Sequence, residues 1–204
     1  GSVWIGTWVG GLNRLRDGRI SAIIFNQPTH GGWEGEVECW LSGDEGRTWA
    51  RAGVPVPHEA GIARMNEAAG IAGNGDLIVI VGGHGGRPPK GQANLDFSKS
   101  AILHPVAVRS SDGGYSWRAC KELPPLATGL PLIPFGPIVR RPDGLLLASF
   151  YDWSPPGSGT PARSNALLYR SGDDGDSWQF HATIASGYYN ETCIHVVDEK
   201  RCLA

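Results

Sequence analysis

The 204-residue sequence lacks several features, and each absence excludes a class of protein. No apolar run reaches the roughly 18 residues that a membrane-spanning helix requires, so no span is expected. Charge of one sign is not in excess, because 18 basic and 20 acidic residues give a net charge of -2. We therefore expect no nucleic-acid partner and no anionic lipid surface. The first residues, Gly-Ser-Val-Trp, lack the basic and apolar segments of a secretory signal peptide.

Short motifs that hold metals, phosphates or cofactors are also missing. The histidines have no ligand-like spacing, no Gly-Lys-Ser/Thr run occurs, and the four cysteines (Cys39, Cys120, Cys193 and Cys202) form no C-x-x-C pair. We predict neither a metal site nor a cofactor. Cys193 and Cys202 flank a turn near Asp198 and could face each other. Buried free thiols are the favoured interpretation, because directly paired strand cysteines need unusual geometry.

Glycine, proline and tryptophan are abundant, with 30, 15 and 8 residues. Together with a hydrophobic fraction of 41%, they predict an all-β chain with many turns and enough apolar material for a core.

An eight-residue pattern, Ser-x-Asp-x-Gly-x-(Ser/Thr)-Trp, occurs three times, at 42–49, 110–117 and 171–178. Its Asp can accept backbone N–H bonds from the residues that follow, and its Gly supplies the positive φ of a tight turn. Its Trp opens the next strand, where the ring can be buried. The copies lie 68 and 61 residues apart, which fits one four-stranded sheet with elaborated loops per copy. The predicted structural residues are Asp44, Asp112, Asp173, Trp49, Trp117 and Trp178.

A second kind of turn precedes each copy. Asp17-Gly18, Asn74-Gly75 and Asp143-Gly144 each lead into an apolar strand. Each unit is therefore predicted as strand, Gly turn, strand, long loop, strand, Asp turn, strand. We place all units in one domain over 1–204, with boundaries at about 3–52, 62–121 and 135–181 and the start of a fourth unit at about 190–204.

Antiparallel order separates the turns from the long connections. If both kinds of turn lie at one end of the sheets, the long connections lie at the other, and function is expected there. These connections carry aromatic rings interleaved with carboxylates, amides and arginine, a combination that suits a sugar. The alternative is that the loops simply expose polar residues.

The chain resembles the sialidase (neuraminidase) superfamily with bacterial-type Asp-box repeats. The resemblance rests on the three Asp patterns and on Arg64-Met65-Asn66-Glu67, Gly136-Pro137-Ile138-Val139 and Asn190-Glu191-Thr192, and it covers nearly the whole chain. It implies an all-β, six-bladed propeller of four-stranded antiparallel blades with Asp-box hairpins, about three and a half of them in this chain. A retaining hydrolysis with a tyrosine nucleophile, a glutamate that activates it, an aspartic acid/base and three arginines is also implied. The resemblance further implies that the protein is secreted or periplasmic.

The resemblance assigns catalytic roles to a few residues. Glu191 falls where the family places the tyrosine-activating glutamate, and the first long loop offers Glu34 and Glu36 in place of the acid/base aspartate. No arginine stands at Thr7 or Trp8, where the family has its first arginine, so strict sialic acid specificity is not expected. The predicted substrate-binding residues are Asn66, Glu67, Arg87, Tyr151, Asp152 and Trp153.

Three functions stay open at this point. The first is a sialidase-like glycoside hydrolase that removes a terminal sugar from a glycan or glycoconjugate. The second is a carbohydrate-binding propeller without catalysis, and the third is a protein-interaction propeller. Because half a ring leaves strand edges open, we expect either a longer polypeptide or association through the exposed blade edges.

Overall fold

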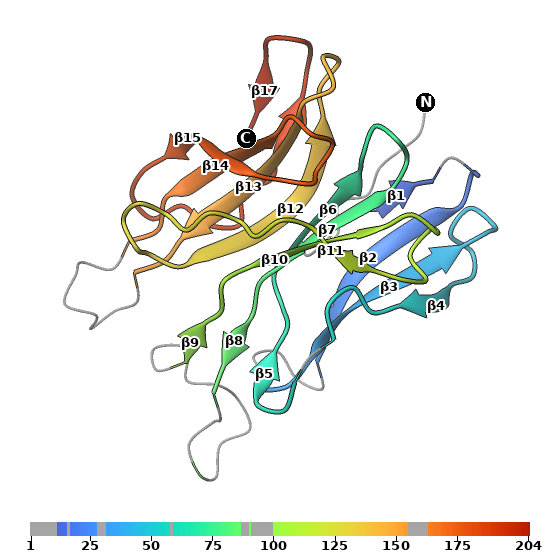
Figure 1. Cartoon of the computed structure of the whole chain (residues 1–204), viewed down its shortest axis with the longest axis horizontal. Helices are drawn as coiled ribbons and strands as arrows, with labels where there is room; N and C mark the ends of the chain where they lie inside the picture. Colours follow the sequence, from blue (N-terminus) through green and yellow to red (C-terminus); the bar gives the residue numbers. More distant parts are fainter. Residues whose placement is uncertain are drawn as a thin grey trace.

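The computed structural model describes residues 12–15, 17–27, 32–57, 59–86, 90, 100–154 and 163–204. The regular structure of these residues is all β, with no helix among them. In these ranges the search for a helix long and apolar enough to cross a membrane therefore finds none. The described strands form one four-stranded sheet, one eight-stranded sheet and two smaller sheets (Figure 1).

The four-stranded sheet comes first in the chain, and we call it the first group. It consists of β1 (Leu12–Arg14), β2 (Ile20–Asn26), β3 (Glu36–Ser42) and β4 (Ala50–Gly53), in chain order and all antiparallel. Its first turn, at 15–19, and its Asp turn, at 43–49, lie at one end of the sheet because neighbouring strands alternate in direction.

The eight-stranded sheet contains two further groups with the same internal order. The second group has β6 (Glu67–Ile71), β7 (Leu77–Val81), β10 (Val106–Ser110) and β11 (Arg118–Ala119). The third group has β12 (Leu132–Arg140), β13 (Leu146–Asp152), β14 (Ala166–Ser171) and β15 (Gln179–Ala185). They are joined where β6 and β12 run parallel, with Ala68 opposite Gly136. A Cβ on Gly70 would lie 2.2 Å from the carbonyl oxygen of Ile138, so this close approach requires glycine.

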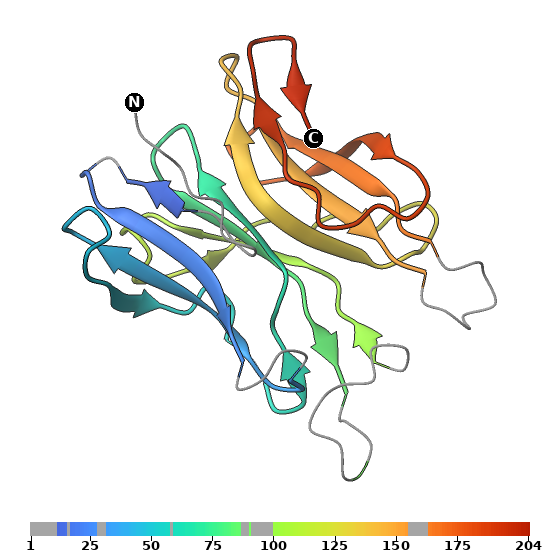
Figure 2. The same cartoon turned by 180° about the vertical axis from the view of Figure 1, so that it is seen from behind.

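Two small sheets complete the fold. Strands β5 (Ile62–Ala63), β8 (His84–Gly85) and β9 (Ala101–Ile102) pair within the long connections of the second group. Near the end of the chain, β16 (His195–Val196) pairs with β17 (Cys202–Leu203). Figure 2 shows the three groups side by side, with the small three-stranded sheet at the end opposite the turns.

The core lies in two layers between the groups. Along β7, alternate side chains point to opposite faces, so Val79 and Val81 pack toward Ile23 of the first group while Ile78 and Ile80 pack toward Phe150 of the third. Both faces of the second group are therefore apolar, which explains the continuous Leu-Ile-Val-Ile-Val sequence of β7.

The three Asp patterns occupy the connections β3–β4, β10–β11 and β14–β15. In the first, Asp44 accepts bonds from the backbone N–H of Thr48 at 2.8 Å and from its hydroxyl at 2.7 Å. The Ser42 hydroxyl accepts the N–H of Gly46 at 2.8 Å. Equivalent bonds form around Asp112 and Asp173. The same local sequence therefore gives the same turn three times.

These turns also connect neighbouring groups. The carboxylate of Asp174 in the third turn accepts the N–H groups of Gly73 and Asn74, at 2.5 and 3.0 Å, in the first turn of the second group. Arg109 adds a bond to the carbonyl oxygen of Asp174 and an ion pair with Asp76 at 3.4 Å. The turn end is thus held by a network of charge-assisted hydrogen bonds.

The tryptophans of the three patterns differ in their surroundings. Trp178 is buried in the layer between the second and third groups, and its indole N–H has no hydrogen-bond partner. Trp49 and Trp117 are half-buried, and their N–H groups donate to the carbonyl oxygens of Gly46 and Gly114 at 3.0 and 3.1 Å.

One expectation about the cysteines is wrong. All four thiols are free, but only Cys39 is buried, whereas Cys193 and Cys202 are exposed. The hairpin β16–β17 places Val196, not Cys193, opposite Cys202. A two-stranded hairpin has no second layer of its own to bury these side chains.

Candidate functional site

We distinguish two sets of polar side chains. Asn66, Glu67, Tyr151 and Glu191 lie at strand ends opposite the Asp turns, and we call them the strand-end cluster for this shared position, although Glu67 faces the first group and Tyr151 packs in a different cluster. The second set lines a cleft that runs along the third group from Phe180 to Asp152, which we call the side cleft.

Asn66 and Glu67 open β6. Asn66 has a φ of 59°, in the left-handed region, and its carbonyl oxygen accepts the N–H of Gly82 at 2.9 Å. Glu67 lies opposite Val81 and, with Ala69, on the face of β6 that meets the first group. Its side chain is fully buried, and neither carboxyl oxygen has a hydrogen-bond partner. Burial raises the pKa of Glu67 to about 8, so this carboxyl is mostly neutral at pH 7.

Tyr151 lies in the third group, and Glu191 lies in the connection through which the chain leaves it. Glu191 is exposed in the connection between β15 and β16, with a φ of 29°. The hydroxyl of Ser149 lies 2.5 Å from the carbonyl oxygen of Thr192, which fixes this connection to β13. Tyr151 is buried, and burial, reinforced by the nearby Glu191 carboxylate, raises the pKa of its phenol. The phenol of Tyr151 is therefore held in its protonated form chiefly by burial, with a smaller electrostatic effect of Glu191.

A further buried ionisable group, His84, lies on the small strand that follows β7 in the chain. His84, on β8, is 4% exposed, and its Nδ1 lies 3.2 Å from the Ser100 hydroxyl. Burial lowers the pKa of His84 to about 4, so the imidazole is neutral at pH 7. This part of the second group therefore carries groups that burial keeps uncharged.

Glu34 and Glu36 lie in the first group, whereas Glu191 lies beyond the third (Figure 1). Glu34 accepts the backbone N–H of Gly61 at 3.3 Å. Glu36 forms an ion pair with Arg51 on the face of β3 opposite the buried Val37. Their catalytic role stays a prediction. Arg87, which was predicted to bind substrate, lies outside the described residues.

Consecutive residues of β13 were predicted as one binding set, but they serve different places. Tyr151 and Trp153 share a small apolar cluster with Ile133 and Phe135. Asp152 lies on the opposite face and lines the side cleft. The period of two along a strand places neighbours on opposite faces, and this signal was present in the sequence.

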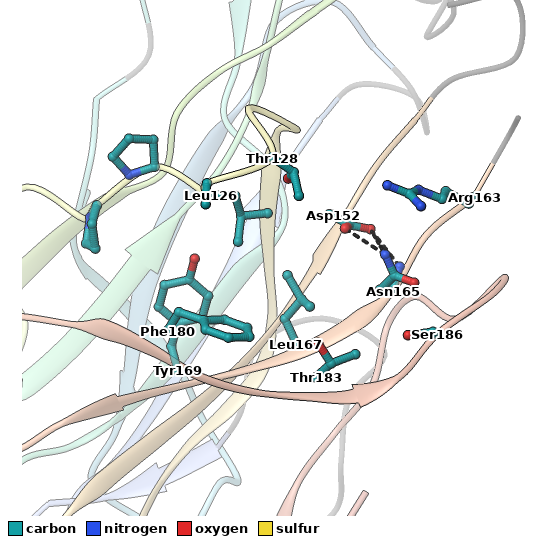
Figure 3. A pocket seen from close by; sticks show the side chains of 13 residues that line it. Leu126, Thr128, Asp152, Arg163, Asn165, Leu167, Tyr169, Phe180, Thr183 and Ser186 are labelled. Carbon is teal, nitrogen blue, oxygen red and sulfur yellow. Dashed lines mark hydrogen bonds between the residues drawn. The ribbon is translucent and has the colours of Figure 1, made fainter. Parts of the chain in front are cut away.

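The side cleft has a volume of about 390 Å³ and lies between the connection 124–128 and strands β13–β15 (Figure 3). One end is apolar and aromatic, and the other is polar. The residues that matter for its chemistry are Leu126, Asp152, Arg163, Asn165, Tyr169 and Phe180.

Hydrogen bonds fix the polar end of the cleft. One oxygen of Asp152 accepts the backbone N–H and the side-chain NH₂ of Asn165, at 2.7 and 3.1 Å. The other oxygen accepts the same NH₂ group at 2.8 Å. The amide oxygen of Asn165 in turn accepts the N–H of Gly187 at 3.2 Å. Sequence analysis missed Asn165, Tyr169 and Phe180, because their strand positions gave no sign that one face borders a cleft.

Within the described ranges, no three His, Cys, Asp or Glu side chains gather in a way that could hold a metal ion.

Comparison with known proteins gives structural relatives only. No family model matches the sequence, and no curated protein matches it. A protein of unknown function from Dyadobacter fermentans DSM 18053 superposes with a TM-score of 0.73 at 18% identity, covering 94% of this chain and 59% of that protein. The Hadza microbial sialidase Hz136 gives a TM-score of 0.71 at 16% identity, covering 91% of this chain and 39% of that protein.

The NanB sialidase from Streptococcus pneumoniae also matches, with a TM-score of 0.67 at 12% identity, covering 94% of this chain and 46% of that protein. The chain thus spans less than two thirds of the length of each of these proteins. At such identities the likeness concerns the fold alone. The fold of this chain is sialidase-like.

Proposed function

We propose that the chain is part of a sialidase-like β-propeller domain that hydrolyses a terminal sugar from a glycan. The three groups of four antiparallel strands would be successive blades, each with an Asp-box turn, and β16–β17 would begin the next. The repeated order of strands and the sialidase-like fold support this. The further blades of the ring would cover the outer faces of the first and third groups.

The observation that carries the proposal is the position of Glu191. This exposed carboxylate lies opposite the Asp turns, in a connection that the Ser149–Thr192 hydrogen bond attaches to β13, and its charge contributes to the raised pKa of Tyr151. Glu191 would act as the base for a tyrosine in the reaction, with Asn66, Glu67 and Trp153 on the substrate side. Glu34 or Glu36 would supply the acid/base carboxyl, and Arg87 would bind substrate. A sugar other than sialic acid fits this set, which holds few cations.

The test uses the full polypeptide that carries this chain. A glycan array identifies ligands, and release of the terminal sugar from each hit is then measured for the wild type, Glu191→Gln and Glu199→Gln. Glu199 is an exposed glutamate on the β16–β17 turn and serves as the matched control. We expect loss of hydrolysis in Glu191→Gln alone. Full activity of that variant on a confirmed substrate would contradict the proposal.

A carbohydrate-binding propeller without catalysis is the second candidate. It is favoured by the lack of an arginine at Thr7 and Trp8, where the sialidase family has its first arginine. This function predicts glycan binding on the array with no hydrolysis of any bound glycan by the wild type.

A further inference from the structure

We propose that the side cleft binds a neutral sugar residue, separately from the strand-end cluster. Both walls of the cleft belong to this chain, because the connection 124–128 forms one wall and strands β13–β15 form the other. The site therefore needs no further blade to be complete. The choice of a saccharide over a peptide rests on the proposed function, whereas the preference for a neutral sugar follows from the cleft itself.

The apolar end can stack a pyranose ring. Phe180 keeps 47% of its surface exposed, although its ring packs edge-to-face on Tyr169 at 5.9 Å. Leu126, from the opposite wall, also lines this end (Figure 3). An exposed aromatic ring inside a cleft gives the C–H face of a sugar a flat surface that excludes water.

The polar end offers one acceptor, Asp152, and one donor, Arg163. The second oxygen of Asp152 accepts a single N–H, from Asn165, and so has lone-pair capacity left. Arg163 is exposed at the mouth and, among the described residues, forms no ion pair, so its guanidinium N–H groups are available. Figure 3 shows it beside Asp152 and Asn165. Neighbouring hydroxyls of one sugar could donate to Asp152 and accept from Arg163.

The same carboxylate disfavours acidic sugars. An anionic group at the polar end would meet Asp152, which is 4% exposed and poorly screened by solvent. The attraction of Arg163 would be offset by this repulsion. Hydroxyl groups avoid the conflict, because they both donate and accept hydrogen bonds. Thr183 and Ser186 add two further hydroxyl groups to the lining.

The first experiment measures binding of methyl β-D-galactopyranoside, methyl β-D-glucopyranoside and methyl β-D-glucuronide to the full polypeptide by NMR titration. At least one neutral glycoside should bind, and the glucuronide should bind several-fold more weakly. Phe180→Ala should weaken binding of the neutral probe about tenfold through loss of the stacking surface. Tyr115→Ala is the matched control, because Tyr115 is an aromatic residue that is 58% exposed on an Asp turn.

The second experiment separates the polar contacts. Arg163→Gln should weaken binding of the neutral glycoside about threefold to tenfold, whereas Arg118→Gln, at an exposed arginine of β11, should leave it unchanged. Binding should persist in Glu191→Gln, which separates this site from the proposed catalytic one. If hydrolysis is absent but binding at the cleft occurs, only the proposed hydrolase function fails.

Three outcomes would overturn the cleft proposal. They are no binding of either neutral glycoside, tighter binding of the glucuronide, and equal losses in the test and control variants. Binding of an acidic peptide that depends on Arg163, without any sugar binding, would show that the ligand class is wrong.

Discussion

The two ends of the strand groups treat charged groups in opposite ways. At the turn end, Asp44 is half-buried, and its hydrogen bonds, first of all from the Thr48 hydroxyl, lower its pKa to about 2. At the other end, burial raises the pKa of Glu67 to about 8 and leaves both of its oxygens without a partner. Asp44 is therefore stabilised as an ion by its neighbours, whereas Glu67 is held as a neutral acid by burial.

The carboxylates of Asp44, Asp112 and Asp173 accept hydrogen bonds from residues within four positions in the sequence, so they stabilise local structure without any ligand. A buried carboxyl without partners costs free energy, and perturbed carboxyls of this kind often lie at functional sites. The predictions below test this contrast.

The largest effect is expected at Glu191. In the full polypeptide, Glu191→Gln should lower the rate of glycoside hydrolysis by about 10²- to 10⁴-fold, because the amide keeps the shape of the side chain but cannot accept a proton. The thermal unfolding midpoint should stay within about 2 °C of the wild type, because Glu191 is exposed. A rate equal to that of the wild type would remove the main catalytic assignment.

The next largest effect concerns Glu67 and pH. Because its folded pKa is raised, protonation of Glu67 favours the folded state. This contribution to the free energy of unfolding is full below the unfolded pKa of about 4.3 and is lost as pH rises toward 8. The free energy of unfolding of Glu67→Gln, taken relative to that of the wild type, should therefore rise by up to about 5 kcal/mol when the pH is raised from 4.5 to 8. Urea unfolding at both pH values measures this.

A matched control for this pH effect is Glu122→Gln, at an exposed glutamate. Its stability should follow the wild type at both pH values. Parallel pH curves for Glu67→Gln and the wild type would show that Glu67 is not held neutral. Titration of His84 affects all three proteins alike and cancels in the difference.

A smaller effect is expected at the turns. Asp173→Ala should lower the free energy of unfolding by about 1–3 kcal/mol, because the N–H and hydroxyl of Ser177 lose their acceptor. Asp112→Ala should behave alike. Asp173→Asn keeps an oxygen acceptor, so its free energy of unfolding should fall by less than that of Asp173→Ala. Glycan affinity should not change, so selective loss of binding in a stable Asp112→Ala variant would contradict the structural role.

The smallest effect is the acid titration of the turns. Partial burial alone would raise the pKa of Asp173, but bonds from the Ser177 side chain and backbone and from Ser171 lower it to about 2. Because the folded pKa is lowered, the ionised carboxylate favours the folded state. This contribution to the free energy of unfolding is full above about pH 4 and is lost as pH falls toward 2. NMR titration of the Asp44 and Asp173 carboxyl carbons should give midpoints near 2. Midpoints near 4 would show that these hydrogen bonds do not persist in solution.

The turn end was predictable because its interactions are local. The hydrogen bonds to the first Ser and to the Asp at the third position of each pattern join residues no more than four positions apart, so the eight residues specify their own turn. The apolar strands after the Gly turns were predictable for the same reason, since β-strand patterns repeat every two residues. The contact of Asp174 with Gly73, across 101 positions, had no signal in either segment.

The burial and the long-range contacts of the candidate site residues could not be predicted in this way. The sequence by itself determined the repeated turns, the strands and the placement of the long connections at one end, because short-range hydrogen bonding and side-chain alternation fix them. Only the tertiary structure decided that Glu67 is buried without a partner, that Tyr151 is buried, and that Asp152 faces a cleft. Burial and long-range proximity depend on how the groups pack against each other, and no local pattern encodes that packing.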